Sequence, residues 1–346
     1  MSSTAPSRDR TQPPRQPWYK AQLSLATSQL FPHDFYGFTV STNNAIPDPP
    51  PHVEIFALRG GSGPPLLLLH GYPQTHLIWH KIIPALREHY TLIIPDLRGY
   101  GRSSKPRRKD DADADDHSWY AKSAMAEDLV VVMDQLGYKD EPFYVLGHDR
   151  GGRVAHAMCV NHPSRVKKAM LLDIVPTLAM FNATDKMLAT AYWHWFFLSQ
   201  ARPFPEDAIL AAPQAFAEKQ LTRMLAASGR KREDVFVDAA WEEYCKLFTD
   251  ADTVHGMCED YRAGAKEDCE EQERNLEEER KIQCKIRVLW GKDGVCEKGF
   301  DVKKEWEKVS KDGCWDERGE AVPGGHYIPE EQPEILTRHA LEFFKD

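Results

Sequence analysis

The sequence lacks any apolar run long enough to cross a membrane. None of its 346 residues belongs to a stretch approaching the roughly 18 consecutive apolar residues that a spanning helix requires. The N-terminal segment is polar and rich in proline, without the apolar stretch of a secretory signal. We therefore predict a cytoplasmic protein that does not contact membranes and that begins with a disordered tail over residues 1–28.

The sequence also lacks paired cysteines and an excess of basic residues. Its seven cysteines form no C-x-x-C pair and no zinc-site spacing, which favours a reducing compartment over a disulfide framework. His76 and His80 are four residues apart but have no H-E-x-x-H context, so we expect no metal there. The formal net charge is −9. Because polyanion binding requires a basic face, we predict no nucleic-acid partner.

What the sequence does contain is a series of short apolar runs that each end in a turn. Five of them lie within residues 64–73, 90–103, 142–152, 166–176 and 286–294. Such runs are typical of parallel strands buried on both faces. Helical patterns separate them, and an alternating segment at 52–60 predicts one more strand before them. The predicted fold class is α/β, with a mostly parallel central sheet and helices on both faces.

Residues 177–265 interrupt this alternation. They show only helical patterns, rich in Trp, Phe, Tyr and Met. An all-helical insertion between two sheet strands predicts a cap over the carboxyl ends of the strands, where open α/β sheets bind ligands. The core domain then comprises residues 29–176 and 266–346. Two charged stretches, 105–117 and 267–281, indicate a solvated loop and an exposed helix.

The segment "LGHDRGGRV" (146–154) carries the main candidate for chemistry. Asp149 closes a predicted strand and opens a predicted helix, and the glycines around it permit a strained turn that projects its side chain above the sheet. The N-terminus of the following helix favours the ionised carboxylate. A simple helix-capping aspartate is the alternative at this position.

A histidine near the end of the chain favours the catalytic interpretation of Asp149. His326 lies in the glycine-rich turn "VPGGHYIPEE", after the last predicted strand. The chain order nucleophile, acid, histidine is then satisfied by Asp149, Asp173 and His326. Asp293 also follows a predicted strand. Either Asp173 or Asp293 could hold the imidazole in its working tautomer, so the residues leave this acid open.

A carboxylate nucleophile suits displacement at a saturated carbon, because the resulting alkyl ester has a carbonyl that belongs to the protein. His326 would then activate water against that carbonyl. The turn "HGYP" places a backbone N–H at Tyr72, which with the backbone N–H of Arg150 predicts an oxyanion hole. The expected substrate is a small molecule whose sp³ carbon carries a halide or an epoxide oxygen. Every step uses protein groups and water, so no cofactor and no metal are expected.

Six segments carry a resemblance to a known family. "LLLLHGYPQTHLIWH", "GHDRGGRV", "LLDIVPT", "YWHWFFLSQ", "MCEDYRAGA" and "GGHYIPEE" resemble, in the same order, segments of the fluoroacetate (haloacetate) dehalogenases of the α/β-hydrolase superfamily, and the resemblance covers roughly residues 50–345. The resemblance implies an α/β-hydrolase fold. It also implies hydrolytic dehalogenation of a short 2-halo carboxylate, of the fluoroacetate or chloroacetate type, to the 2-hydroxy acid through an aspartyl ester.

The resemblance further implies roles for particular side chains. Arg150 and Arg153 would bind the substrate carboxylate, which suits guanidinium groups in charge and in fork geometry. Three cap side chains would hold the leaving halide, namely His194, Trp195 and Tyr261. The family takes its triad acid from the strand after the nucleophile, which favours Asp173. A homodimer is an expectation from the resemblance alone.

Two other functions remain open. A soluble epoxide hydrolase would use the same Asp and His chemistry to give a diol, with two cap tyrosines to protonate the opening oxygen. The available candidates are Tyr192, Tyr244 and Tyr261, but an apolar epoxide leaves Arg150 and Arg153 without a partner. The second alternative is a non-catalytic small-molecule receptor built on this fold. The presence of all three triad residue types favours an enzyme over a receptor.

Overall fold

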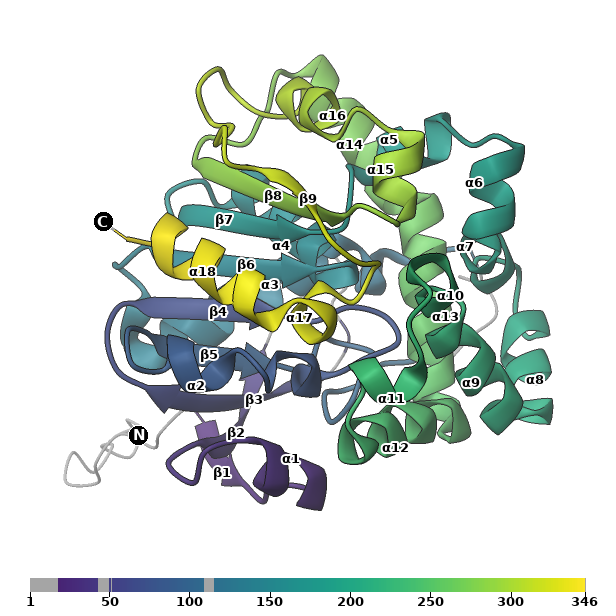
Figure 1. Cartoon of the computed structure of the whole chain (residues 1–346), viewed down its shortest axis with the longest axis horizontal. Coiled ribbons are helices and arrows are strands. Elements are labelled where there is room, and N and C mark those ends of the chain that lie inside the picture. Colours follow the sequence, from purple (N-terminus) through teal and green to yellow (C-terminus); the bar gives the residue numbers. More distant parts are fainter. Residues whose placement is uncertain (1–17, 43–49, 51, 109–114, 346) are drawn as a thin grey trace, which may run out of the picture.

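A single twisted sheet forms the centre of the molecule. The computed structural model describes residues 18–42, 50, 52–108 and 115–345. The strands are β1 (Trp18–Ala21), β2 (Tyr36–Thr42), β3 (Val53–Gly61), β4 (Pro65–Leu69), β5 (Thr91–Pro95), β6 (Phe143–His148), β7 (Val166–Leu172), β8 (Lys285–Gly291) and β9 (Glu320–Val322). Their order in the sheet is β1-β2-β3-β5-β4-β6-β7-β8-β9 (Figure 1).

The predicted mostly parallel sheet is confirmed. The pairs from β5 to β9 are parallel, whereas β1, β2 and β3 pair in antiparallel fashion and β3 joins β5 antiparallel. The five apolar runs correspond to β4, β5, β6, β7 and β8, and every residue of β4, β5 and β6 is buried. Burial on both faces explains why these strands read as continuous apolar runs. The parallel register brings the carboxyl ends of β4, β6, β7, β8 and β9 to one edge of the sheet.

Helices cover both faces of the sheet. The core helices are α2 (Ile83–Leu86), α3 (Lys122–Met133), α4 (Arg150–Asn161), α14 (Glu267–Glu277), α15 (Val295–Gly299), α16 (Val302–Lys308), α17 (Ile328–Glu331) and α18 (Pro333–Phe343). Figure 1 shows α2 and α18 in front of the sheet and α3 and α4 behind it. The acidic stretch expected to be an exposed helix forms α14, although Asp268 and Asn275 of that helix are buried.

The N-terminal region differs from its prediction. The disordered tail expected over residues 1–28 is wrong for residues 18–28, which form β1 and the beginning of α1 (Leu25–Leu30). The reason is an aromatic anchor, because the ring of Trp18 lies 5.8 Å from that of Phe38 and 6.2 Å from that of Tyr36 on β2. The two adjacent aromatic residues of this segment, Trp18 and Tyr19, hardly change the average composition of a polar, proline-rich stretch. Residues 1–17 lie outside the described residues.

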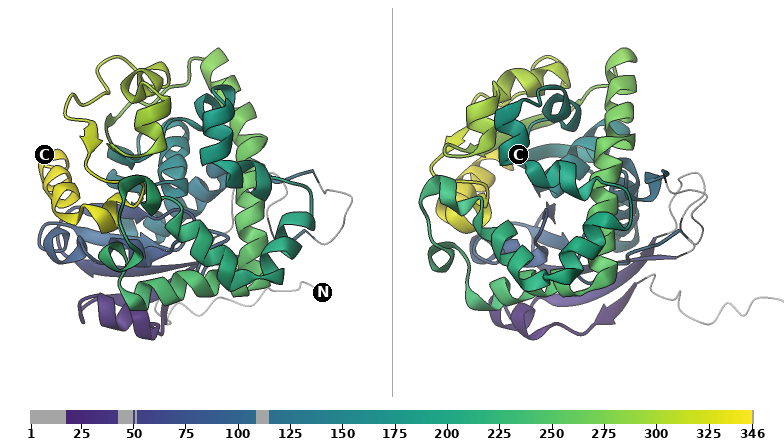
Figure 2. Two further views of the ribbon diagram at one scale, coloured as in Figure 1. Left: turned by 45° about the vertical axis from the view of Figure 1, so that its right-hand side comes forward. Right: turned by 90° about the vertical axis from the view of Figure 1, so that its right-hand side faces the viewer.

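A group of helices lies beyond the carboxyl ends of the strands, and we call it the cap. It comprises α5 (Thr177–Asn182), α6 (Lys186–Ala191), α7 (Trp193–Leu198), α8 (Phe204–Ala211), α9 (Pro213–Thr222), α10 (Leu225–Ser228), α11 (Arg232–Val235), α12 (Asp238–Lys246) and α13 (Ala251–Ala265). Figure 1 shows most of these helices to the right of the sheet, and the right-hand view of Figure 2 looks onto them. In the sequence these helices lie between β7 and β8, so the cap faces the turns that follow the strands.

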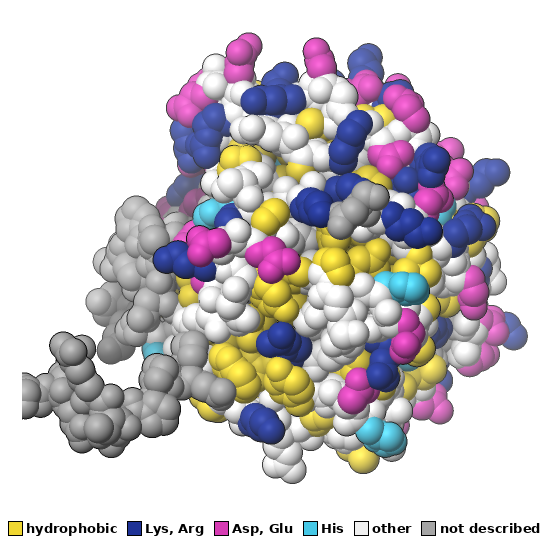
Figure 3. All heavy atoms as spheres, turned by 90° about the vertical axis from the view of Figure 1, so that its left-hand side faces the viewer, with side chains coloured by type: hydrophobic (Ala, Val, Ile, Leu, Met, Phe, Trp, Pro, Cys, Tyr) yellow, Lys and Arg dark blue, Asp and Glu magenta, His cyan; other side chains and the backbone are white. Residues whose placement is uncertain are grey.

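The surface carries charges of both signs. On the face shown in Figure 3, Lys and Arg side chains stand among Asp and Glu side chains across the described residues. A polyanion would instead require a face of one sign. Among the residues that the structure describes, no helix combines the length and the apolar character needed to cross a bilayer.

Candidate active site

Asp149 lies in a sharp turn between β6 and α4. Its backbone φ is 49°, a conformation that non-glycine residues seldom adopt and that marks a strained turn. The turn packs tightly against the strand next to it, since a Cβ atom on Gly151 would lie 2.3 Å from the carbonyl oxygens of Leu69 and His70. The predicted elbow therefore projects the Asp149 carboxylate from the edge where β4 and β6 end.

Two groups approach the Asp149 carboxylate. The backbone N–H of Tyr72 donates a hydrogen bond of 2.9 Å to Oδ1, and Nε2 of His326 lies 3.7 Å from Oδ2. Burial alone would raise the pKa of Asp149, but the neighbouring His326 and the arginines lower it below its ordinary value. The carboxylate is therefore held ionised, as a nucleophile requires. Of the two predicted oxyanion donors, the Tyr72 N–H makes its bond, and the described hydrogen bonds include none from the Arg150 N–H to this carboxylate.

The structure distinguishes the two candidate triad acids. Asp173 Oδ2 lies 2.6 Å from Nδ1 of His326, and its other oxygen accepts a 2.9 Å bond from the Gly291 N–H. Asp293 makes backbone bonds, including one of 3.0 Å from its N–H to the Gly324 carbonyl. Both aspartates follow a strand, but of these two only Asp173 contacts the imidazole of His326. Asp173 is also strained, with a φ of 51°.

His326 is fixed from two sides. Burial alone would lower its pKa, but the hydrogen bond and charge of Asp173, with the charge of Asp149, raise the pKa above its ordinary value. His148 Nε2 donates a 2.8 Å hydrogen bond to the His326 carbonyl oxygen, and the two rings lie 4.7 Å apart. Burial lowers the pKa of His148 to about 3, so it is a neutral support. His148 immediately precedes Asp149, but a histidine at this position of the sequence did not by itself indicate that it supports His326.

Arg150 has an internal partner that the sequence did not predict. Its Nε and Nη2 donate bonds of 2.9 Å to the two carboxylate oxygens of Asp260 on α13. Asp260 also pairs with Lys122 and accepts a 2.6 Å bond from the Tyr100 hydroxyl. Burial opposes the charged form of Arg150, but Asp260 raises the pKa of the guanidinium above its ordinary value. Its Nη1 is buried without a hydrogen-bond partner.

Arg153, unlike Arg150, has no carboxylate among the described residues that forms an ion pair with its buried charge. Its Nη1 donates 3.0 Å bonds to the Val175 carbonyl and the Thr177 hydroxyl, and its Nε is buried without a partner. Burial and the charge of Arg150 lower the pKa of Arg153, although the charge of Asp149 acts in the opposite direction. A buried guanidinium without an ion-pair partner is costly, so an anionic ligand beside Arg153 would offset this cost.

The three predicted halide-binding side chains lie together on the cap. The ring of Tyr261 lies 5.5 Å from that of His194 and 5.9 Å from that of Trp195. Tyr72, whose backbone contacts Asp149, stacks on His194 at 5.9 Å and meets Tyr261 at 5.1 Å. The Arg153 guanidinium lies 4.6 Å from the Trp195 ring. Cap and core thus form one aromatic cluster beside Asp149, the candidate nucleophile.

Several buried polar atoms in this cluster have no hydrogen-bond partner. They are Arg150 Nη1, Arg153 Nε, His194 Nδ1, Tyr72 OH and Tyr261 OH. Buried polar groups are nearly always hydrogen-bonded in folded proteins. Unpartnered donors that surround a carboxylate nucleophile are consistent with a site built for a ligand that supplies the missing acceptors.

The tyrosines considered for epoxide opening separate into two groups. The Tyr261 hydroxyl is buried and unpartnered, and the ring of Tyr192 stacks on Trp195 within the cluster. Tyr244 instead donates a 2.8 Å bond to Glu330, which also accepts a 3.0 Å bond from Gln74. Tyr244 therefore joins the cap to the core, and its hydroxyl is already engaged in a hydrogen bond with Glu330.

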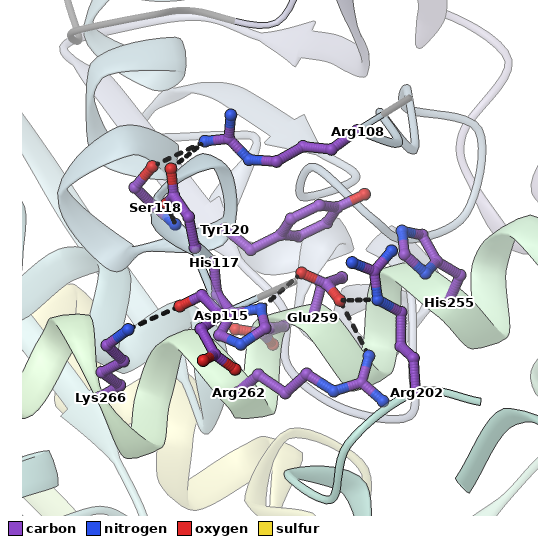
Figure 4. Close-up of polar contacts among 12 residues, drawn as sticks. Arg108, Asp115, His117, Ser118, Tyr120, Arg202, His255, Glu259, Arg262 and Lys266 are labelled. Carbon is purple, nitrogen blue, oxygen red and sulfur yellow. Dashed lines mark hydrogen bonds and ion pairs between the residues drawn. The ribbon is translucent and has the colours of Figure 1, made fainter. Parts of the chain in front are cut away.

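Potential metal ligands are already paired. His76 Nδ1 lies 2.8 Å from Asp96, and His80 Nδ1 donates a 2.9 Å bond to the Leu77 carbonyl, so both are buried structural histidines. Among the described residues, one group has the spacing of metal ligands, namely Glu206, His255 and Glu259. Arg262 donates bonds of 2.7 Å and 2.8 Å to its two carboxylates. Figure 4 shows Glu259 between Arg262, Arg202 and His117, so the side chains of the protein, two guanidinium groups among them, already pair with these carboxylates.

Comparisons with known proteins agree with this geometry. The alpha/beta hydrolase fold family matches residues 64–247. A fluoroacetate dehalogenase from Burkholderia sp is 40% identical over 294 residues, which cover 85% of this chain and 91% of the relative. A soluble epoxide hydrolase from Corynebacterium sp. (strain C12) is 29% identical over 288 residues, covering 83% and 92%. A solved alpha/beta hydrolase structure from Nostoc sp PCC 7120 has a TM-score of 0.78 at 41% identity, covering 89% of this chain and 97% of that one.

Proposed function

Since the chain belongs to the α/β-hydrolase family and resembles a fluoroacetate dehalogenase, we propose that it hydrolyses the carbon–halogen bond of short 2-halo carboxylates. The observation that carries the proposal is that a buried carboxylate, the proposed nucleophile, lies near a buried guanidinium that forms no ion pair with any described residue. Asp149 supplies the first, held by the Tyr72 N–H at 2.9 Å. Arg153 supplies the second.

In the first step, an Asp149 oxygen attacks C2 of the substrate. A carbon–oxygen bond forms while the carbon–halogen bond breaks, and the halide leaves with the bonding electron pair. The substrate carboxylate binds beside Arg153 and Nη1 of Arg150, which orients C2 towards the nucleophile. His194, Trp195 and Tyr261 provide ring N–H and O–H groups for the departing halide, because charge develops there in the transition state.

In the second step, water cleaves the aspartyl ester. Nε2 of His326 takes a proton from water, and the hydroxide attacks the carbonyl carbon of the Asp149 side chain. The Tyr72 N–H, already 2.9 Å from Oδ1 in the resting carboxylate, stabilises the oxyanion. When the tetrahedral intermediate collapses, the bond between the Asp149 carboxyl carbon and the ester oxygen of the substrate breaks. The 2-hydroxy acid leaves after taking the proton from His326, and the oxygen from water stays in Asp149.

Asp173 orients the base throughout this cycle. Its 2.6 Å contact with Nδ1 of His326 keeps Nε2 free to accept a proton and stabilises the imidazolium that forms. The paired strand ends hold the geometry, since Asp149 follows β6 and Asp173 follows β7 in parallel register. This arrangement supports two-step hydrolysis by protein groups and water.

An epoxide hydrolase is the second candidate, favoured by the unpartnered hydroxyl of Tyr261 and the Corynebacterium relative. It would require a second phenol beside Tyr261; Tyr244 is bonded to Glu330, which leaves Tyr192 within the aromatic cluster. An uncharged epoxide would, however, supply no anionic group to Arg153, which has no ion-pair partner among the described residues. This feature favours the haloacid.

The deciding experiment measures halide release from fluoroacetate and chloroacetate, with a panel of epoxides assayed in parallel. Asp149→Asn is the control, read at early times because slow deamidation could restore the carboxylate. Halide release that depends on Asp149 supports the dehalogenase. Diol formation without halide release would move the protein to the epoxide hydrolases. Ligand binding without turnover of any substrate would favour a receptor.

A further inference from the structure

Arg223 contacts a residue of the proposed halide site. It follows α9 and lies on the cap, with its Nη2 3.1 Å from Nε2 of His194. Its Nη1 donates a 2.9 Å bond to the Ala191 carbonyl at the end of α6. The guanidinium is therefore held by two hydrogen bonds and contacts the imidazole at Nε2.

The direction of this hydrogen bond defines the tautomer of His194. A guanidinium has five N–H donors and no acceptor, so Nε2 of His194 must supply the lone pair. A neutral imidazole with its lone pair on Nε2 carries its hydrogen on Nδ1. Burial and the charge of Arg223 hold the pKa of His194 well below its usual range, which keeps the ring neutral.

Nδ1 of His194 is one of the buried atoms without a partner. The ring that carries it stacks on Tyr72 at 5.9 Å, with an interplanar angle of 16°, and lies 5.5 Å from Tyr261. Tyr72 in turn contacts Asp149 through its backbone. The unpartnered N–H therefore belongs to the same cluster as the nucleophile and the unpartnered Tyr261 hydroxyl.

We propose that Arg223 is a positioning residue, which holds His194 in its Nδ1–H form so that this N–H donates to the departing halide. The inference rests on the proposed dehalogenase function. Without Arg223, the proton is free to occupy Nε2, and Nδ1 would then present a lone pair to an anion. A lone pair facing developing negative charge would oppose the step that it is meant to assist.

The first test is independent of turnover. Nitrogen-15 NMR of histidine-labelled, substrate-free enzyme reports which ring nitrogen carries hydrogen, and a His194→Gln variant assigns the signals. We expect the Nδ1–H form in the wild type, a shift towards Nε2–H in Arg223→Met, and partial return in Arg223→Lys. Arg202→Met, which removes another cap arginine that lies 3.7 Å from Glu259, should leave the tautomer unchanged.

The second test compares leaving groups. Fluoride accepts hydrogen bonds more strongly than chloride or bromide, so Arg223→Met should slow fluoride release about 10- to 100-fold, the worth of one hydrogen bond to a charged group. Chloride and bromide release should fall less, with KM for each acid little changed. An Nε2–H or protonated His194 in the wild type, or an unchanged tautomer in Arg223→Met, would overturn the proposal. Equal losses for all halides would overturn the leaving-group role.

Failure of the proposed function would look different. If no haloacid is turned over, the dehalogenase assignment fails, while the NMR result still decides whether Arg223 sets the tautomer. If haloacids are turned over and the tautomer does not depend on Arg223, the dehalogenase stands and this inference falls.

Discussion

The pair between Arg150 and Asp260 gives the sharpest prediction about stability. Both side chains are completely buried. Asp260 also forms an ion pair with Lys122 and accepts a hydrogen bond from the Tyr100 hydroxyl. Asp260→Asn would keep the size of the side chain but leave two buried cations with one anion fewer. Removing one partner of a buried ion pair typically costs about 3–5 kcal/mol of unfolding free energy, and we expect a loss in that range for Asp260→Asn.

The assay is equilibrium urea unfolding followed by tryptophan fluorescence at neutral pH. Asp252→Asn is the matched control, because Asp252 pairs with Arg107 at 2.9 Å but its side chain is 65% exposed. An exposed pair of this kind contributes about 0–1 kcal/mol. Equal losses for the two variants would refute the claim that Asp260 compensates Arg150 in the core.

The pH dependence of this difference has a defined sign. Arg150 and Lys122 lower the pKa of Asp260 below its unfolded value, although burial acts in the opposite direction. A lowered carboxyl pKa contributes stability that is fully present well above the unfolded pKa of about 3.9. It is lost as the pH falls towards the folded pKa. The gap between wild type and Asp260→Asn should therefore narrow as the solution is acidified below about pH 4.

Three further predictions concern the proposed reaction. Haloacid turnover should rise with pH through the raised pKa of His326, because only the neutral ring can activate water. Quench-flow mass spectrometry should accordingly find more alkyl-enzyme at low pH. Turnover that falls as the pH rises would contradict the role of His326 as the base. Gly71→Ala would place a Cβ atom 2.5 Å from Oδ1 of Asp149, so halide release should fall about 100-fold. Gly299→Ala, whose Cβ would meet flexible side-chain atoms at 3.3 Å, should change little. Arg153→Met should lower kcat/KM for haloacids about 10- to 100-fold, the worth of a charge-assisted hydrogen bond, and should spare uncharged haloacetamides; equal losses would remove its carboxylate role.

The local features of the core were predictable from the sequence. Strands β4 to β8 are short apolar runs because both of their faces are buried, and the elbow at Asp149 has the glycines that its close packing demands. The proposed nucleophile and base follow from chain order and strand ends. The residues alone did not distinguish the proposed triad acid, Asp173, from Asp293, since both follow strands. What separates them is whether the side chain contacts Nδ1 of His326, which depends on the tertiary structure.

Long-range pairing escaped prediction. Asp260 lies 110 residues from Arg150, and although it precedes Tyr261 in a segment already singled out, nothing in its neighbours indicated a buried acid. Arg223 lies 29 residues from His194 across two turns of the cap. The strand at Trp18 was not predicted for a different reason, because the aromatic contacts of Trp18 with β2 stabilise a segment that is otherwise mostly polar. In each case the interaction depends on packing between elements that no local pattern encodes.

The central claim is that the substrate alkylates Asp149 and that water then attacks the carbonyl carbon of the Asp149 side chain. A single turnover of excess enzyme with a haloacid in oxygen-18 water tests this most directly. Mass spectrometry of both the 2-hydroxy acid and the peptide that contains Asp149 should locate the label. The account predicts oxygen-18 in Asp149 and an unlabelled product. Label in the product of the first turnover, with Asp149 unlabelled, would show direct attack of water on C2 and contradict it.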